Sequence, residues 1–140
     1  MSVVGKTIEG ITLKATSGLE VTFPDICKKG KTVIYFYPKD DTPGCTIQAC
    51  SYRDNIESFK NAGVQVIGVS SDDMESHDAF TAKFNLNFPL IVDSEQVLRN
   101  SLGATGRDSF LLDETGTVIN EWKSVSPSET VKETLDAALS

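Results

Sequence analysis

The sequence has few of the residues from which many enzyme sites are built. Its 140 residues include three cysteines and one histidine, and the cysteines, Cys27, Cys45 and Cys50, form no C-x-x-C pair. A C-x-x-C disulfide oxidoreductase is therefore disfavoured. A zinc site is disfavoured too, because the cysteines and His77 have no recognisable ligand spacing. We expect neither a metal nor a cofactor.

Positive charge and long apolar runs are also scarce. Thirteen Lys and Arg face twenty Asp and Glu, which gives a net charge of -7. Because a surface this acidic repels phosphate backbones, we expect no nucleic-acid partner. No apolar run approaches the roughly 20 residues that span a bilayer, and the start of the chain lacks the basic and apolar regions of a signal peptide. We expect no membrane association and a cytoplasmic location, and a mature organellar form remains the alternative.

The order of the expected elements indicates the fold class. Strands are expected at 11–13, 21–23, 31–37, 64–69, 88–92, 109–112 and 117–122, and helices at 42–63, 74–84, 95–102 and 126–139. The first two strands flank a Ser17-Gly18 turn and predict a hairpin. The apolar, β-branched runs 31–37 and 64–69 are typical of strands that are covered on both faces. We predict one domain, 1–140, with a central mixed β-sheet flanked by helices and an N-terminal β-hairpin.

The helix after the first buried strand places a cysteine where an anion is favoured. Thr42 suits the N-cap and Pro43 the first helical position, so Cys45 lies in the first turn. Unpaired backbone N–H groups and the helix dipole stabilise negative charge there, and thiols at such positions are more acidic than free cysteine. Asp40 and Asp41 oppose this effect, and a nearby cation would help it.

The spacing of Cys45 and Cys50 is unfavourable for a disulfide. Five residues along an α-helix correspond to a rise of about 7.5 Å and a rotation of about 140°, which puts the two Cα atoms roughly 8–9 Å apart. A disulfide requires Cα atoms within about 7 Å. The pair therefore either never bonds, as two inert helix cysteines, or bonds after the helix unwinds. The residues alone leave both interpretations open.

A longer motif decides between them. The pattern Pro38-x-x-x-Thr42-x-x-Cys45 resembles the active-site signature of the peroxiredoxins, and the segment 35–50 resembles their bacterioferritin-comigratory, or Q-type, branch. Segments 68–72, 76–77, 88–93, Arg107 with 109–110, and 113–116 follow in the family's order, so the likeness covers nearly the whole chain. The resemblance implies a thioredoxin-like fold of peroxiredoxin type and a cofactor-free thiol peroxidase that acts on hydrogen peroxide and organic hydroperoxides.

The resemblance also implies roles for five residues. Cys45 would be the peroxidatic cysteine, which becomes a sulfenic acid, and Cys50 the resolving cysteine, which closes an intramolecular disulfide. Thr42 would hydrogen-bond the thiolate and the peroxide, Pro38 would shield the site from water, and Arg107 would be the missing cation. Thioredoxin or a glutaredoxin-like dithiol would reduce the disulfide. Since this disulfide needs no second subunit, we expect a monomer.

The sequence also gives expectations for three other residues. Asp108 stands where relatives usually have a small neutral residue, and we expect it to pair with Arg107 or to face water. Cys27 is expected to be a non-catalytic thiol, with a resolving role as the alternative. His77 is expected to be structural or solvent-facing rather than a general base.

A competing hypothesis uses the same thiols without catalysis. The chain could be a redox-sensing or partner-binding domain in which the disulfide acts as a conformational switch. Such a domain would show no fast peroxide turnover, so rapid-mixing measurements of peroxide consumption separate the two hypotheses.

Overall fold

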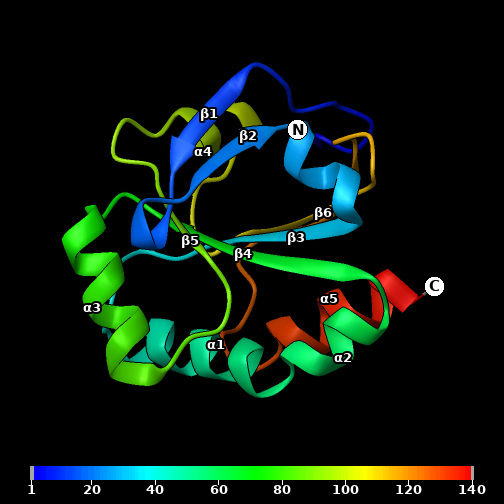
Figure 1. Cartoon of the computed structure of the whole chain (residues 1–140). Helices are drawn as coiled ribbons and strands as arrows, with labels where there is room; N and C mark the ends of the chain where they lie inside the picture. The colour runs from blue at the N-terminus through cyan, green and yellow to red at the C-terminus, as the bar shows by residue number, and fades with distance from the viewer. Residues whose placement is uncertain (1, 140) are drawn as a thin grey trace.

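A five-stranded mixed β-sheet lies at the centre of the computed structural model, which describes residues 2–139 (Figure 1). Its strands, in sheet order, are β5 (Leu90–Val92), β4 (Val64–Ser70), β3 (Lys31–Phe36), β6 (Ser109–Leu112) and β7 (Val118–Trp122). Strands β3, β4 and β5 are parallel, whereas β6 and β7 are antiparallel to their neighbours. The predicted N-terminal hairpin is also present, formed by β1 (Ile11–Lys14) and β2 (Glu20–Phe23).

Helices cover the sheet in separate layers. Their bounds are α1 Pro43–Asp54, α2 Ile56–Asn61, α3 Met74–Phe84, α4 Val97–Leu102 and α5 Thr130–Leu139, with short 3-10 helices η1 Thr16–Gly18 and η2 Asp25–Lys29. Figure 1 shows α1, α2 and α5 on one side of the sheet and the hairpin with α4 on the other, while α3 packs beside β5 and η1. Between residues 2 and 139, no helix has the length and apolar character that crossing a membrane requires.

The two faces of β3 supply two separate cores, as the alternation of side chains along a strand dictates. Val33 and Tyr35 pack into the cluster under α1 and α5, whereas Ile34 and Phe36 pack into the cluster under the hairpin and α4. All four side chains are fully buried. Since each buried side chain of this size contributes about 1.5–3 kcal/mol, β3 is held from both sides. The loop that follows β3 therefore starts from a fixed point.

The helix expected from Thr42 to Gly63 is broken in two. Asn55, with φ -112° and ψ 10°, separates α1 from α2. Its side-chain amide donates to the Ser51 carbonyl oxygen at 2.8 Å, a local bond by which asparagine competes with helical geometry. The apolar stripe that suggested one helix is nevertheless buried on both sides of the break, from Cys45 to Phe59.

The C-terminal helix also differs from its prediction. It begins at Thr130, after a turn in which the Glu129 N–H donates to the Ser126 carbonyl oxygen at 3.0 Å. Val131 is buried, whereas Leu139, at the last position of the helix, is 64% exposed. The buried face is completed by Thr134 and Ala138 instead.

Candidate active site

Cys45 lies where the parallel strands end, the edge at which open α/β sheets hold their chemistry. Strand β3 ends at Phe36, and a loop over residues 37–42 leads into the first turn of α1. Pro43, Gly44 and Cys45 are the first three helical residues, as predicted. The Cys45 side chain is only 1% exposed, so its sulfur is screened from bulk water.

The guanidinium of Arg107 contacts the sulfur of Cys45. Its Nη2 and Nη1 atoms lie 3.5 and 3.6 Å from Cys45 Sγ. The chain is brought there by the pairing of β3 with β6, in which Tyr35 is opposite Ser109 and the Phe36 N–H donates to the Asp108 carbonyl oxygen. A cation at this distance stabilises negative charge on sulfur. The structure thus brings together the two residues that sequence reasoning paired.

Gln48 belongs to the same group, and the sequence reasoning gave it no role. It is fully buried, and its Oε1 accepts a hydrogen bond of 2.9 Å from Arg107 Nη1. Its Nε2 has no hydrogen-bond partner among residues 2–139. A signal was available: Gln48 is one turn after Cys45 on the same helix, and a glutamine on a buried helix face requires a polar partner.

The first turn of α1 leaves room for Arg107 because residue 44 is glycine. A Cβ atom built on Gly44 would lie 3.1 Å from Arg107 Nη2 and 3.5 Å from a side-chain carbon of Pro127. The bare backbone therefore lets the guanidinium approach the start of the helix, where the N–H groups also favour an anion.

Thr42 and Pro38 belong to the loop over residues 37–42 that leads to Cys45. The Thr42 backbone is extended, as an N-cap requires, but within residues 2–139 its hydroxyl caps no N–H of the helix and instead donates to the Lys39 carbonyl oxygen at 3.0 Å. The capping role expected of the Thr42 side chain is therefore wrong, while its position is right. Pro38 is exposed at the start of the loop.

Cys50 lies on the same unbroken helix as Cys45. It is partly buried, and all three cysteines are free thiols. Both facts agree with the geometric argument that a disulfide cannot span five residues of intact helix.

Asp108 fits neither of the two expectations for it. Its carboxylate is fully buried and accepts hydrogen bonds from the N–H groups of Thr105 and Ser124, both at 2.8 Å, and from Lys123 Nζ at 3.3 Å. Burial alone would raise the pKa of Asp108, but these donors outweigh it and the pKa is lowered. The carboxylate is thus occupied by the turn before β6 and the segment after β7, which leaves the Arg107 guanidinium to Cys45 and Gln48.

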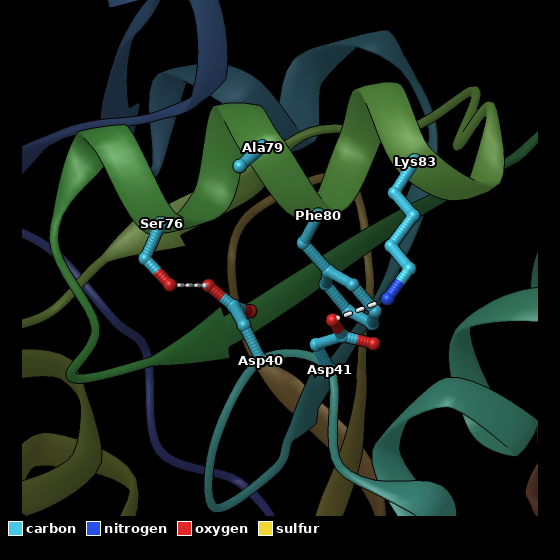
Figure 2. Close-up of a pocket in the computed structure, with 6 residues that line it drawn as sticks. All are labelled: Asp40, Asp41, Ser76, Ala79, Phe80 and Lys83. Carbon is cyan, nitrogen blue, oxygen red and sulfur yellow. Dashed lines mark hydrogen bonds and ion pairs between the residues drawn. The ribbon is translucent and has the colours of Figure 1, made fainter.

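The loop before Cys45 carries two acids that meet different partners across a cavity of about 180 Å³ beside α3 (Figure 2). Asp41 pairs with Lys83 at 2.7 Å, and both side chains are largely exposed. Asp40 points under α3, where its carboxylate accepts hydrogen bonds from Ser76 at 2.8 Å and from His77 at 2.7 Å.

His77 is buried, so the solvent-facing alternative is wrong and the structural one fits. Its Nδ1 meets Asp40, and its Nε2 lies 2.8 Å from the carbonyl oxygen of Ile91. Burial lowers the pKa of His77, but the bond to Asp40 and its charge more than offset burial, so the pKa is raised. Burial would raise the pKa of Asp40, yet His77 and Tyr37 lower it overall.

Cys27 lies apart from these groups, in η2. It is fully buried, and burial is the main reason why the pKa of its thiol is raised. A thiol that resists ionisation is a poor nucleophile, which agrees with the expected non-catalytic role.

Comparison with known proteins identifies the class. The chain is 42% identical over 132 residues to a chloroplastic peroxiredoxin Q of Gentiana triflora, covering 84% of this chain and 60% of the relative. It is 39% identical over 146 residues to peroxiredoxin Bcp of Bacillus subtilis (strain 168), covering 94% and 92%. The structure of a Xanthomonas campestris bacterioferritin comigratory protein, studied for its alkyl peroxide reduction activity, superposes with a TM-score of 0.88 and 28% identity over 95% of this chain and 97% of that one.

The fold is thus the thioredoxin-like fold of peroxiredoxins, as predicted. Cys45, the cysteine of the sequence motif, lies in the first turn of α1. Residues 4–121 match the AhpC/TSA family, and the chain belongs to that family. The chain spans about 60% of the length of the Gentiana relative.

Proposed function

We propose that the chain is a thiol peroxidase that reduces hydrogen peroxide and organic hydroperoxides at Cys45. The observation that carries this proposal is the Arg107 guanidinium at 3.5 Å from Cys45 Sγ, in a site that excludes most water. The peroxiredoxins named above, one of them studied for alkyl peroxide reduction, support the same substrate class. We expect an antioxidant role in cell redox homeostasis.

The first step is attack by the Cys45 thiolate on one oxygen of the peroxide. The O–O bond breaks, the sulfur gains that oxygen and becomes a sulfenic acid, and the other oxygen leaves as water or an alcohol after taking up a proton. Arg107 stabilises the charge that moves from sulfur to the leaving oxygen. Thr42 would turn its hydroxyl from Lys39 toward the peroxide, and Pro38 would restrict water at the site.

The second step is closure of the Cys45–Cys50 disulfide with release of water. The intact helix holds the two thiols apart, so its first turns must unwind before the sulfurs can meet. An external dithiol, thioredoxin or a glutaredoxin-like protein, then reduces the disulfide by exchange. The whole cycle takes place within one chain, so we propose a monomer that works in a reducing compartment such as the cytoplasm.

Intact mass spectrometry after one equivalent of hydrogen peroxide tests this cycle. We expect the loss of two hydrogens, mapped to Cys45 and Cys50. The Cys45→Ser variant should consume no peroxide, and full turnover by it would reject the assignment. Cys50→Ser should keep one fast turnover and lose recycling by thioredoxin, and unchanged recycling would reject its resolving role.

The same measurements decide against or in favour of a redox sensor. A sensor domain would form the disulfide slowly and would show no sustained peroxide consumption with excess thioredoxin and its reductase. Fast and sustained consumption, followed by stopped flow, supports the enzyme.

A further inference from the structure

The two acids of the loop before Cys45 are neutralised in different environments. The Asp41–Lys83 pair is solvated, with side chains 45% and 59% exposed, so water screens both charges. The Asp40–His77 pair is buried, with side chains 4% and 0% exposed. A buried carboxylate acts on its surroundings through a lower dielectric than an exposed one. Of the two acids, Asp40 is therefore the one whose charge is less screened by water.

The hydrogen bonds require a charged His77. The Ile91 carbonyl oxygen can only accept, so His77 Nε2 must donate to it. The Asp40 carboxylate already accepts the hydroxyls of Tyr37 at 2.6 Å and Ser76 at 2.8 Å, an environment that keeps it ionised, so Nδ1 must donate as well. A histidine that donates from both nitrogens is an imidazolium.

The pair also fixes the course of the loop. The Asp40 N–H donates to Asp72 Oδ2 at 2.7 Å, and Asp72 in turn accepts from the Ser70 hydroxyl at 2.9 Å at the end of β4. The groups that face His77 are thus Asp40 and Tyr37 from the β3 side, Asp72 from the β4 side and the Ile91 carbonyl from β5. Two carboxylates and one imidazolium meet under the loop, and His77 is the positive member.

We propose that His77 is a positioning residue for the reaction at Cys45, because its positive charge cancels Asp40 and ties the loop that enters α1 to α3. The proposal rests on the proposed peroxidase function. It removes the difficulty that an acid five residues before Cys45 would oppose the thiolate. Asp40 can stay in the loop, where it accepts three hydrogen bonds, without repelling the nucleophile.

The pH profile of Cys45 alkylation by iodoacetamide tests the proposal. Alkylation requires the thiolate but no peroxidase activity, so this readout does not depend on whether the proposed function holds. In His77→Gln the uncancelled Asp40 charge should move the midpoint of the profile upward by roughly half a unit to one unit. Below the midpoint this corresponds to alkylation that is about three- to tenfold slower. Peptide mapping assigns the modification to Cys45.

The double variant separates electrostatics from packing. In His77→Gln/Asp40→Asn both charges are gone, and the midpoint should return to the wild-type value. A midpoint that stays as high as in His77→Gln, or rises further, would overturn the proposal, and so would an unchanged midpoint in the single variant. Lys83→Gln is the matched control and should leave the midpoint in place, because water already screens Asp41.

A fourth variant covers the outcome in which His77→Gln does not fold. Asp40→Asn alone removes the acid and allows His77 to become neutral, so its midpoint should equal that of the wild type or lie below it. A higher midpoint in this variant contradicts the proposal. If alkylation responds as expected while no variant, wild type included, turns over peroxide, the positioning role stands and the proposed function fails.

Discussion

The two ends of helix α1 are held in different ways. At the first end Gly44 has no side chain to pack, the Thr42 hydroxyl bonds to the loop rather than to the helix, and Ile47 is 51% exposed. At the second end Tyr52 is fully buried, stacks on Tyr35 with ring centroids 4.7 Å apart, and donates or accepts hydrogen bonds with two threonines of α5.

This difference indicates where the helix can open. Local unfolding begins where the backbone is weakly held. The first end of α1 has no side-chain cap and is held mainly through Cys45 and Gln48, which contact Arg107, so we expect it to open when Cys45 reacts. The second end keeps its place, because opening it would expose aromatic rings and unpair buried hydroxyls. The thiols of Cys45 and Cys50 lie in the part of the helix that leads from the weakly held end toward the anchored one. We therefore expect the first turns of α1 to open while its second end stays anchored.

Replacement of Arg107 by Gln should have the largest effect on the reaction with peroxide, and it changes contacts at the first end of α1 only. We expect the second-order rate constant for hydrogen peroxide to fall about 100-fold, roughly 2.7 kcal/mol of barrier, because the leaving oxygen loses its cation. Stopped-flow measurement of a single turnover gives this constant. The control is Arg99→Gln, whose guanidinium packs over Phe36 in the other core and should not affect the rate. A drop of less than threefold in Arg107→Gln would contradict the assigned role.

The contact between His77 and Asp40, in the loop that enters the first end of α1, should make the free energy of unfolding depend on pH. The pKa of His77 is raised in the folded state, so its contribution is complete below the unfolded value of about 6.5 and is lost as pH rises through the folded pKa. Within that interval the free energy of unfolding should fall by up to about 1.4 kcal/mol per pH unit.

Urea titrations at a series of pH values measure this slope. The chain has a single histidine. The His77→Gln variant should therefore lack the decline in the free energy of unfolding that begins above a pH of about 6.5. A slope that persists in this variant would assign the effect to other groups. On the acid side, the lowered pKa of Asp40 gives stability that is lost as pH falls through the folded value.

Tyr52→Phe tests the second end and should have the smallest effect of the three. Burial raises the pKa of Tyr52 to about 12, so the hydroxyl stays protonated and bonded to Thr130 and Thr134. Its removal should lower the free energy of unfolding by about 1 kcal/mol. The single-turnover rate with peroxide should not change, and a tenfold loss of rate would contradict the separation of the two ends.

Tyr35→Phe is the matched control in urea unfolding. The Tyr35 hydroxyl is buried without a hydrogen-bond partner among residues 2–139. Its removal should therefore leave stability unchanged or raise it, since a desolvated and unpaired group is lost. A loss as large as that of Tyr52→Phe would contradict the assignment of the Tyr52 effect to its hydrogen bonds, because the Tyr35 hydroxyl makes none within residues 2–139.

Local patterns were sufficient to predict most elements. Helix α3 has the predicted bounds, Met74–Phe84, because its ends are marked in the sequence: Asp73 accepts from the Ser76 N–H at 2.8 Å, and Asn85 adopts the left-handed conformation that ends a helix. The break at Asn55 was missed because the apolar stripe continues through it. Hydrophobic periodicity reports which face is buried, but a single side chain that bonds its own backbone can interrupt the helix without altering that face.

The candidate site was predictable where the motif is continuous and less so where distant segments meet. The position of Cys45 in the first turn of a helix follows from one stretch of chain, whereas the roles of Cys50, Thr42 and Arg107 required the family resemblance. The partners of Asp40, His77 and Asp108 could not be assigned, because each depends on tertiary contacts, such as the one between Asp40 and His77, which are 37 positions apart. Charge patterns alone suggested that these acids are solvated or harmful to the thiolate, whereas buried acids are stable when several donors surround them.

The pairing of β6 with β3 has a consequence for the tolerance of the chain to insertions. The register places Ser109 opposite Tyr35, and the bond from Phe36 to the Asp108 carbonyl fixes the residue next to Arg107. A slip of one residue would turn every β6 side chain to the opposite face and displace Arg107 from Cys45. The length of the chain between α4 and β6 is therefore as much a part of the active site as the arginine itself, and a library of loop lengths there should lose peroxide reduction before it loses the fold.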